Sequence, residues 1–124
     1  SSDAIVRAIL DSRVPVVVWV APRDARAASA GVFVTYAANV AAMAPGTRIG
    51  SASPVALGGE LDETMARKAT NDAVSQVRNL ADVRGRNADW AEAAVRDAAN
   101  VTAEEAERLG VADVVAADLP SLLA

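Results

Sequence analysis

The chain has 124 residues, of which 52% are hydrophobic, and a formal net charge of −4 with acidic and basic side chains interspersed. That length fits one compact domain, and the absence of a basic run gives no indication of nucleic-acid binding. Because the chain contains neither cysteine nor histidine, disulfides, thiolate chemistry, the usual zinc sites and a Ser-His-Asp triad are excluded. A hydrolase built from this chain must therefore use another base.

The amino-terminal half predicts helices and buried strands in alternation. Val14–Ala21 is a nearly continuous β-branched run, which is typical of a strand buried on both faces in a parallel sheet. The other elements expected here are a short helix capped by Ser2 or Asp3, a polar loop at Pro22–Arg26, a buried helix at Ala27–Asn39 after a small-residue turn, and a second strand at Val40–Ala44.

The carboxy-terminal half begins with a Gly-, Ser- and Pro-rich segment, Ile49–Gly59, which predicts an irregular binding loop. We expect Gly50, Ser51 and Ala52 in this loop to contact substrate, and the loop to be poorly ordered without it. The elements expected after it are a long helix at Leu61–Val83 ended by Gly85, a helix capped by Asn87, a helix with a capping box of Thr102 and Glu105, a third strand at Val111–Ala116, and a helical turn capped by Asp118.

This alternation of strands and helices predicts an α/β fold with a layered sheet. The chain shows no internal repeat, linker or low-complexity segment. We therefore expect residues 1–124 to form a single domain.

Two residues are candidates for chemistry. Ser29 lies among small residues where a buried helix begins, so the N–H of Ala30 and the positive end of the helix dipole can stabilise an oxyanion. Ser29 as a plain helix cap explains the same local sequence. Lys68 is the single lysine among twelve basic residues, and it lies at the border of the apolar stripe expected on the long helix, where we expect its amine to be desolvated. A desolvated lysine can lose its proton, whereas arginine cannot. A lysine whose stem covers the edge of the core is the other interpretation.

Several segments together resemble the membrane-bound serine protease domain of the NfeD family, which is related to the ClpP and crotonase folds. They are AASAG at 27–31, MAPGTRIG at 43–50, RGRNA at 84–88 and EAERLGVAD at 105–113, within a resemblance that covers nearly the whole chain. It implies that Ser29 is the nucleophile and Lys68 the general base, with no cofactor and no metal. It also implies a polypeptide substrate with a hydrophobic stretch, including stomatin-like partners, and a homodimer or higher oligomer.

The resemblance further implies that a strand and a Gly-Gly loop, which supplies a second oxyanion donor, precede residue 1. We therefore expect an amino-terminally truncated domain that lacks the family's first strand, and Gly58-Gly59 is wrongly placed to replace the loop. The full-length protein is expected to be membrane-associated, with this domain extracytoplasmic. The fragment itself is expected to be soluble, since it has a polar amino terminus and no apolar run near the ~18 residues that span a membrane.

Three alternatives remain open. A signal-peptide-peptidase-type Ser–Lys protease would share the fold and the dyad, and a crotonase-like acyl-CoA enzyme would need a carboxylate base that we do not find. A non-catalytic oligomerisation or partner-binding module of the same fold is the third. A β-lactamase-type site is excluded because the chain has no S-x-x-K sequence.

Overall fold

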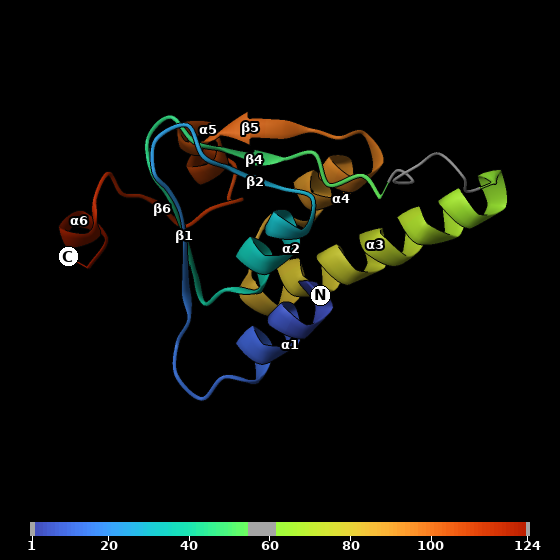
Figure 1. The fold of residues 1–124 in the computed structure, drawn as a ribbon, viewed down its shortest axis with the longest axis horizontal. Helices are drawn as coiled ribbons and strands as arrows, with labels where there is room; N and C mark the ends of the chain where they lie inside the picture. The colour runs from blue at the N-terminus through green and yellow to red at the C-terminus, as the bar shows by residue number, and fades with distance from the viewer. Residues whose placement is uncertain (1, 55–61, 124) are drawn as a thin grey trace.

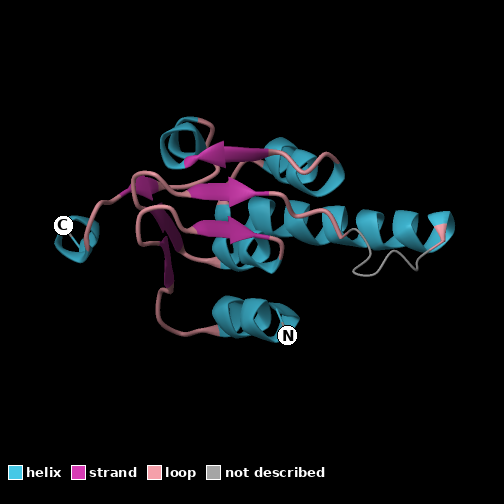
Figure 2. Ribbon diagram, turned by 45° about the horizontal axis from the view of Figure 1, so that its top comes forward, coloured by secondary structure: helices cyan, strands magenta, loops and turns pink. Residues whose placement is uncertain are grey.

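The computed structural model describes residues 2–54 and 62–123, which form two small sheets flanked by helices (Figure 1). Figure 2 shows the second sheet in front of the helices, with the first sheet seen nearly edge-on beside it. In chain order the elements are α1 (Ser2–Asp11), β1 (Val17–Val20), β2 (Arg26–Ala28), α2 (Ala30–Ala37), β3 (Val40–Met43), β4 (Arg48–Gly50), α3 (Glu63–Arg84), α4 (Ala88–Arg96), β5 (Asn100–Thr102), α5 (Ala103–Arg108), β6 (Val114–Val115) and α6 (Leu119–Leu123).

The chain crosses repeatedly between the two sheets. The first sheet has the order β1-β3-β6 and is parallel throughout. In the second, with the order β2-β4-β5, β2 and β4 are parallel and β5 is antiparallel to β4. The register places Ala28 beside Gly50 and Gly50 beside Asn100. As a result, three small or polar residues from distant parts of the sequence lie in one row at the end of β2.

Small side chains make up much of the core. Helix α2 packs against α1, α3 and β2, and it contributes the fully buried Val32 and Tyr36. The ring of Tyr36 stacks on that of Trp90 in α4, with centroids 6.2 Å apart. Close approach of the backbones lets such a core reach normal packing density despite its small residues. The alanines with no exposed surface are Ala37, Ala38, Ala41, Ala42, Ala81, Ala91, Ala94, Ala103 and Ala106.

The RGRNA segment joins α3 to α4 and ties both to the first sheet. Gly85 ends α3 in the left-handed conformation, and the side chain of Asn87 caps α4. The buried guanidinium of Arg86 donates to the carbonyls of Tyr36 and Ala38, both at 2.8 Å, and to the carboxylate of Asp113 at 2.6 Å. Its part in the motif is therefore structural: it holds the end of α2 against the strands that follow.

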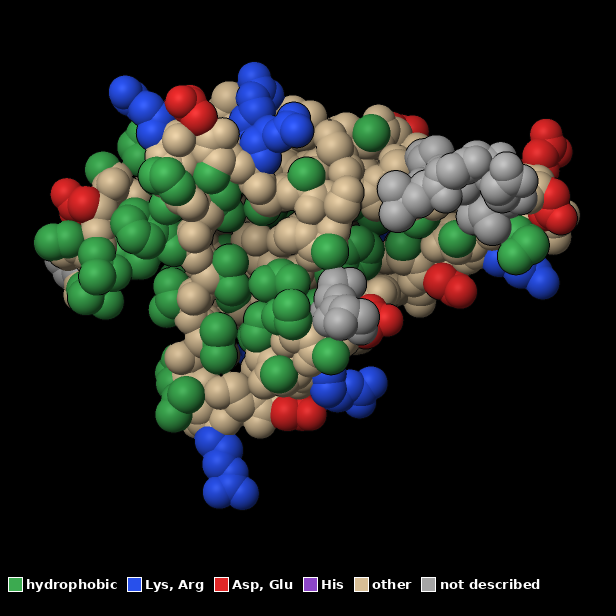
Figure 3. Space-filling model, viewed as in Figure 1, with side chains coloured by type: hydrophobic (Ala, Val, Ile, Leu, Met, Phe, Trp, Pro, Cys, Tyr) green, Lys and Arg blue, Asp and Glu red, His purple; other side chains and the backbone are tan. Residues whose placement is uncertain are grey.

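A helix is present in each region where the sequence predicts one, although the helix predicted at Ala27–Asn39 is shorter than expected, and the strand predictions need correction. Val14–Ala21 is not buried on both faces, because β1 covers only its second half and lies at a sheet edge with Val17 46% exposed. Figure 3 shows apolar side chains gathered over this edge and over α6. The third strand is likewise shorter than Val111–Ala116.

Three further strands were missed. The segment Ala27–Asn39 is not a helix throughout, since β2 ends inside it before α2 begins. Similarly, Ile49–Gly59 starts within β4, and β5 precedes α5. The remainder of the predicted loop, from residue 55 onward, lies outside the described residues. These strands are only three residues long and are defined by partners far away in the sequence, so local patterns do not reveal them.

Candidate active site

Ser29 lies on a sharp turn between β2 and α2. Its backbone has φ 51° and ψ −120°, which is unusual for a residue other than glycine. Although Ser29 occupies the cap position of α2, its side chain makes no capping hydrogen bond, and the residue is exposed. The interpretation of Ser29 as a plain helix cap therefore loses its main support. The hydroxyl is presented to solvent at the end of a strand.

The backbone around Ser29 leaves one N–H in a suitable place for a substrate. The N–H of Ser29 itself donates to the carbonyl of Ser51 at 3.2 Å, and its carbonyl accepts from Val32 at 3.1 Å. Ala30, the first residue of α2, is exposed and donates no backbone hydrogen bond to the described residues. An anion near Ser29 would therefore meet the N–H of Ala30 at the positive end of the helix.

The predicted substrate-contact residues occupy the neighbouring turn. Gly50 ends β4. Ser51 follows it with φ 57°, and the carbonyl of Ser51 accepts a hydrogen bond from the N–H of Ser29. The side chain of Ala52 is buried, and its N–H donates to the carbonyl of Ala94 at 2.9 Å. Gly50 and Ser51 thus lie beside Ser29, whereas Ala52 supports this turn from the core side.

Lys68 occupies a different environment from the one expected. It lies in the second turn of α3, which extends away from the rest of the molecule at that end (Figure 1). Both Lys68 and Met65 are exposed, and the buried residues of α3 begin only at Val74. No hydrogen bond joins Lys68 to Ser29 among those of the described residues. The desolvation expected for Lys68 is therefore not provided by this part of the chain.

Polar side chains that the sequence did not single out surround Ser51. Asn100 in β5 contacts Ser51 and Arg48 by side-chain hydrogen bonds of 3.0 Å each. No motif marks Asn100 in the sequence. Only the antiparallel pairing of β4 with β5 brings it close to the turn that carries Ser29.

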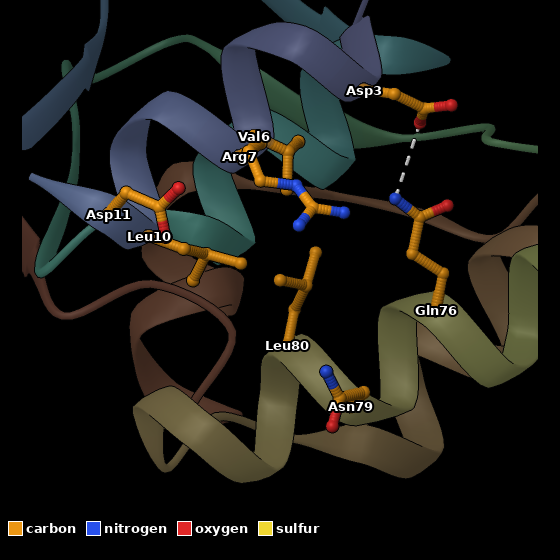
Figure 4. A pocket seen from close by; sticks show the side chains of 8 residues that line it. All are labelled: Asp3, Val6, Arg7, Leu10, Asp11, Gln76, Asn79 and Leu80. Carbon is orange, nitrogen blue, oxygen red and sulfur yellow. Dashed lines mark hydrogen bonds between the residues drawn. The ribbon is translucent and has the colours of Figure 1, made fainter.

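A hollow of about 440 Å³ lies between α1 and α3 and is shown in Figure 4. Its floor is apolar, with Val6 and Leu80, and Gln76 donates to Asp3 across its rim at 3.4 Å. It is formed by other elements than those that carry Ser29. In the described parts of the chain, no cluster of acidic residues is placed to hold a metal ion, and no helix has the length and apolar character needed to cross a bilayer.

Comparison with models of known protein families gives no match. Among curated proteins, the chain is 39% identical over 122 residues to a membrane-bound protease of Pyrococcus horikoshii. The match covers 96% of this chain but 27% of that protein, so the chain spans about a quarter of the relative's length.

The solved structures that resemble this chain also include membrane-bound proteases, at a similar sequence identity. A serine-to-alanine mutant of a membrane-bound stomatin-specific protease has a TM-score of 0.89 at 37% identity, covering 98% of this chain and 60% of that one. A lysine-to-alanine mutant in complex with a substrate peptide has a TM-score of 0.87 at 36% identity, covering 99% and 58%. ClpP1 from Listeria monocytogenes has a TM-score of 0.65 at 20% identity, covering 98% and 68%, which shows the fold alone. The expected ClpP-like α/β fold class is confirmed.

Proposed function

We propose that this chain is the catalytic domain of a serine endopeptidase. It is a close homologue of the Pyrococcus horikoshii membrane-bound protease, which agrees with its resemblance to the NfeD family. Ser29 is its nucleophile and Lys68 its general base. The observation that carries the proposal is the conformation of Ser29: a strained strand-to-helix turn with an exposed, uncapped hydroxyl.

The relatives support the choice of both residues. Their solved structures include one mutant of a serine and one of a lysine, each changed to alanine. Those two positions are separated by nearly the same number of residues as Ser29 and Lys68 are here. Because this chain has one lysine, no other amine of a side chain can fill that role.

The reaction follows from these groups. The hydroxyl oxygen of Ser29 attacks the carbonyl carbon of the scissile peptide bond while the neutral amine of Lys68 takes the hydroxyl proton. The N–H of Ala30 donates to the oxyanion; the N–H of Ser29 is already bonded to Ser51. The tetrahedral intermediate then expels the amine product, which receives the proton from Lys68. Water, deprotonated by the same lysine, hydrolyses the acyl-enzyme and restores Ser29.

Lys68 needs cover to act in this way, since an exposed lysine stays protonated near neutral pH. The described part of the chain does not supply that cover. We propose that a second copy of the chain, in a homodimer or higher oligomer, packs over the amino-terminal half of α3. The exposure of Met65 beside Lys68, with 53% of the residue accessible, is consistent with such a contact.

For the substrate, we propose a polypeptide with a hydrophobic stretch, including stomatin-like proteins, because the solved relatives are described as stomatin-specific. Gly50 and Ser51 would line the path of the substrate beside Ser29. We further propose that residues 1–124 are one domain of a longer, membrane-associated protein, with this domain extracytoplasmic and with the second oxyanion donor supplied by an earlier segment.

A second candidate function is a non-catalytic oligomerisation module of the same fold, and the exposure of Lys68 is the observation that favours it. Labelling of the protein in its natural length with a fluorophosphonate probe separates the two. We expect wild type to be labelled and Ser29→Ala to be unlabelled. Ser75→Ala is the matched control, because Ser75 is an exposed serine on α3, and this variant should be labelled like wild type. No labelling of wild type would favour the module.

A further inference from the structure

Three residues with strained backbones meet at the turn that carries Ser29. Four residues other than glycine have positive φ among the described residues, and three of them, Ser29, Ser51 and Ala98, are joined by hydrogen bonds. The N–H of Ser29 donates to the carbonyl of Ser51 at 3.2 Å, and the hydroxyl of Ser51 donates to the carbonyl of Ala98 at 3.3 Å. Such conformations persist only where surrounding contacts hold them.

We propose that Asn100 is a positioning residue that holds Ser29 in its reactive geometry by acting through Ser51. The proposal rests on the proposed peptidase function. Asn100 does not touch Ser29. Its amide lies between the guanidinium of Arg48 and the hydroxyl of Ser51, at 3.0 Å from each.

The chemistry of the groups fixes the direction of each hydrogen bond in the series that links Arg48, Asn100, Ser51 and Ala98. A guanidinium can only donate, so the amide oxygen of Asn100 must face Arg48. The amide nitrogen of Asn100 therefore faces Ser51 and donates to its hydroxyl oxygen. The proton of the Ser51 hydroxyl is then left to bind the carbonyl of Ala98. The four groups form one donor-to-acceptor series that starts at a permanent positive charge, and each bond strengthens the next.

This series fixes the peptide on which Ser29 depends. Ser51 is bonded by its backbone and its side chain to residues 98–100, which lead into β5: its N–H donates to the carbonyl of Ala99 at 2.9 Å, and its hydroxyl contacts both Asn100 and Ala98. The carbonyl of Ser51 is thereby aimed at the N–H of Ser29. Loss of the Asn100 amide would leave Ser51 free to relax from its positive φ. The carbonyl would then turn, and the hydroxyl of Ser29 would move with the turn.

The test compares peptide hydrolysis by wild type, Asn100→Ala and a control, Asn79→Ala, in the protein of natural length. Asn79 is an exposed asparagine of α3 that lines the hollow beside α1. We expect Asn100→Ala to lower kcat by roughly 10- to 100-fold with KM changed less than about threefold, because small misplacements of reacting groups cost about this much. Asn79→Ala should match wild type, and the melting temperatures of all three should agree within a few degrees.

Two further variants test the route through Ser51. Ser51→Ala should lower kcat to the same extent as Asn100→Ala, and the double variant should be no worse than either, since both changes break one series. Arg48→Ala should show a smaller loss in kcat that Arg48→Lys restores, because lysine also donates to the amide oxygen of Asn100. Additive losses, or a loss that only parallels unfolding, would overturn the positioning role.

The outcomes also separate this inference from the function on which it rests. Active wild type with an equally active Asn100→Ala variant overturns the positioning role alone. Wild type that hydrolyses no peptide and takes up no fluorophosphonate overturns the peptidase function, and the role of Asn100 with it.

Discussion

Replacing Gly50 by alanine should damage the proposed active site around Ser29 without changing either of the proposed catalytic residues. A Cβ at this position would lie 2.2 Å from the carbonyl oxygen of Ala99 and 2.4 Å from the Cα of Asn100, in a backbone with φ 141°. Ordinary contacts for a Cβ begin near 3.4 Å, so β4 and β5 must separate by about 1 Å. The hydrogen bond from Ser51 to Ala99, 2.9 Å long, would then exceed 3.5 Å and be lost.

The magnitude follows from this displacement. Overpacking and the unfavourable φ together should lower the free energy of unfolding by on the order of 3 kcal/mol. Because Ser51 carries the acceptor for the N–H of Ser29, a shift of about 1 Å there should lower kcat by roughly 100-fold. The assays are peptide hydrolysis under conditions in which the variant is still folded, and urea unfolding.

Gly110→Ala is the matched control. Gly110 also has a positive φ, of 78°, but nothing lies within 4 Å of an added Cβ. It should therefore lose only about 1 kcal/mol and keep its activity. A Gly50→Ala enzyme with the turnover of the Gly110→Ala enzyme would refute the reasoning that the contact between β4 and β5 positions Ser29.

Three other predictions concern the base, the RGRNA segment and acid stability. Lys68→Arg should be nearly as inactive as Lys68→Ala in peptide hydrolysis, with kcat lowered about 10²–10⁴-fold, because arginine cannot deprotonate; near wild-type turnover in the arginine variant would exclude Lys68 as the base. Arg86→Ala should lower the free energy of unfolding in urea by about 3 kcal/mol, since two buried carbonyls and a carboxylate lose their donor; an unchanged unfolding midpoint would argue against this. Hydrogen bonds from Arg96 and Arg78 hold the pKa of Glu92 below its usual value of 4.5. The stabilisation by the ionised Glu92 is therefore complete above pH 4.5 and is lost as the pH falls through the lowered pKa. The melting temperatures of wild type and Glu92→Gln should therefore converge as the pH is lowered below 4.5, and a constant difference would contradict the assignment.

Features set by a few neighbouring residues were predictable from the sequence. Asn87 and Thr102 cap helices as expected, with their side chains accepting from the N–H three residues on, and Gly85 ends α3. In each case the interacting atoms lie within one helical turn, so the local sequence contains the whole interaction. The ClpP-like fold class was likewise accessible, through the resemblance.

Features set by distant neighbours were not predictable. The sequence predicts the end of a loop and the start of a helix where the structure has β2, because the partner of this strand in β4 lies more than twenty residues away. Asn100 gave no signal, since its importance comes only from its register beside Gly50. The burial expected for Lys68 failed for a related reason: an apolar stripe predicts that something covers a helix, but it does not say which part of the helix this chain covers.

The incomplete docking of α3 has a consequence for how the protein fluctuates. The helix has 22 residues, but its buried side chains, from Val74 to Ala81, all lie in the carboxy-terminal half. Its first turns therefore depend on intrinsic helix propensity and the Asp62 cap, and they should open far more often than the core, giving fast amide exchange at Lys68 and slow exchange near Leu80. On the proposal that Lys68 is the base and that a second copy covers it, peptide cleavage would be coupled to assembly. The free chain would rarely present an ordered amine to Ser29, and the second copy would supply the missing order.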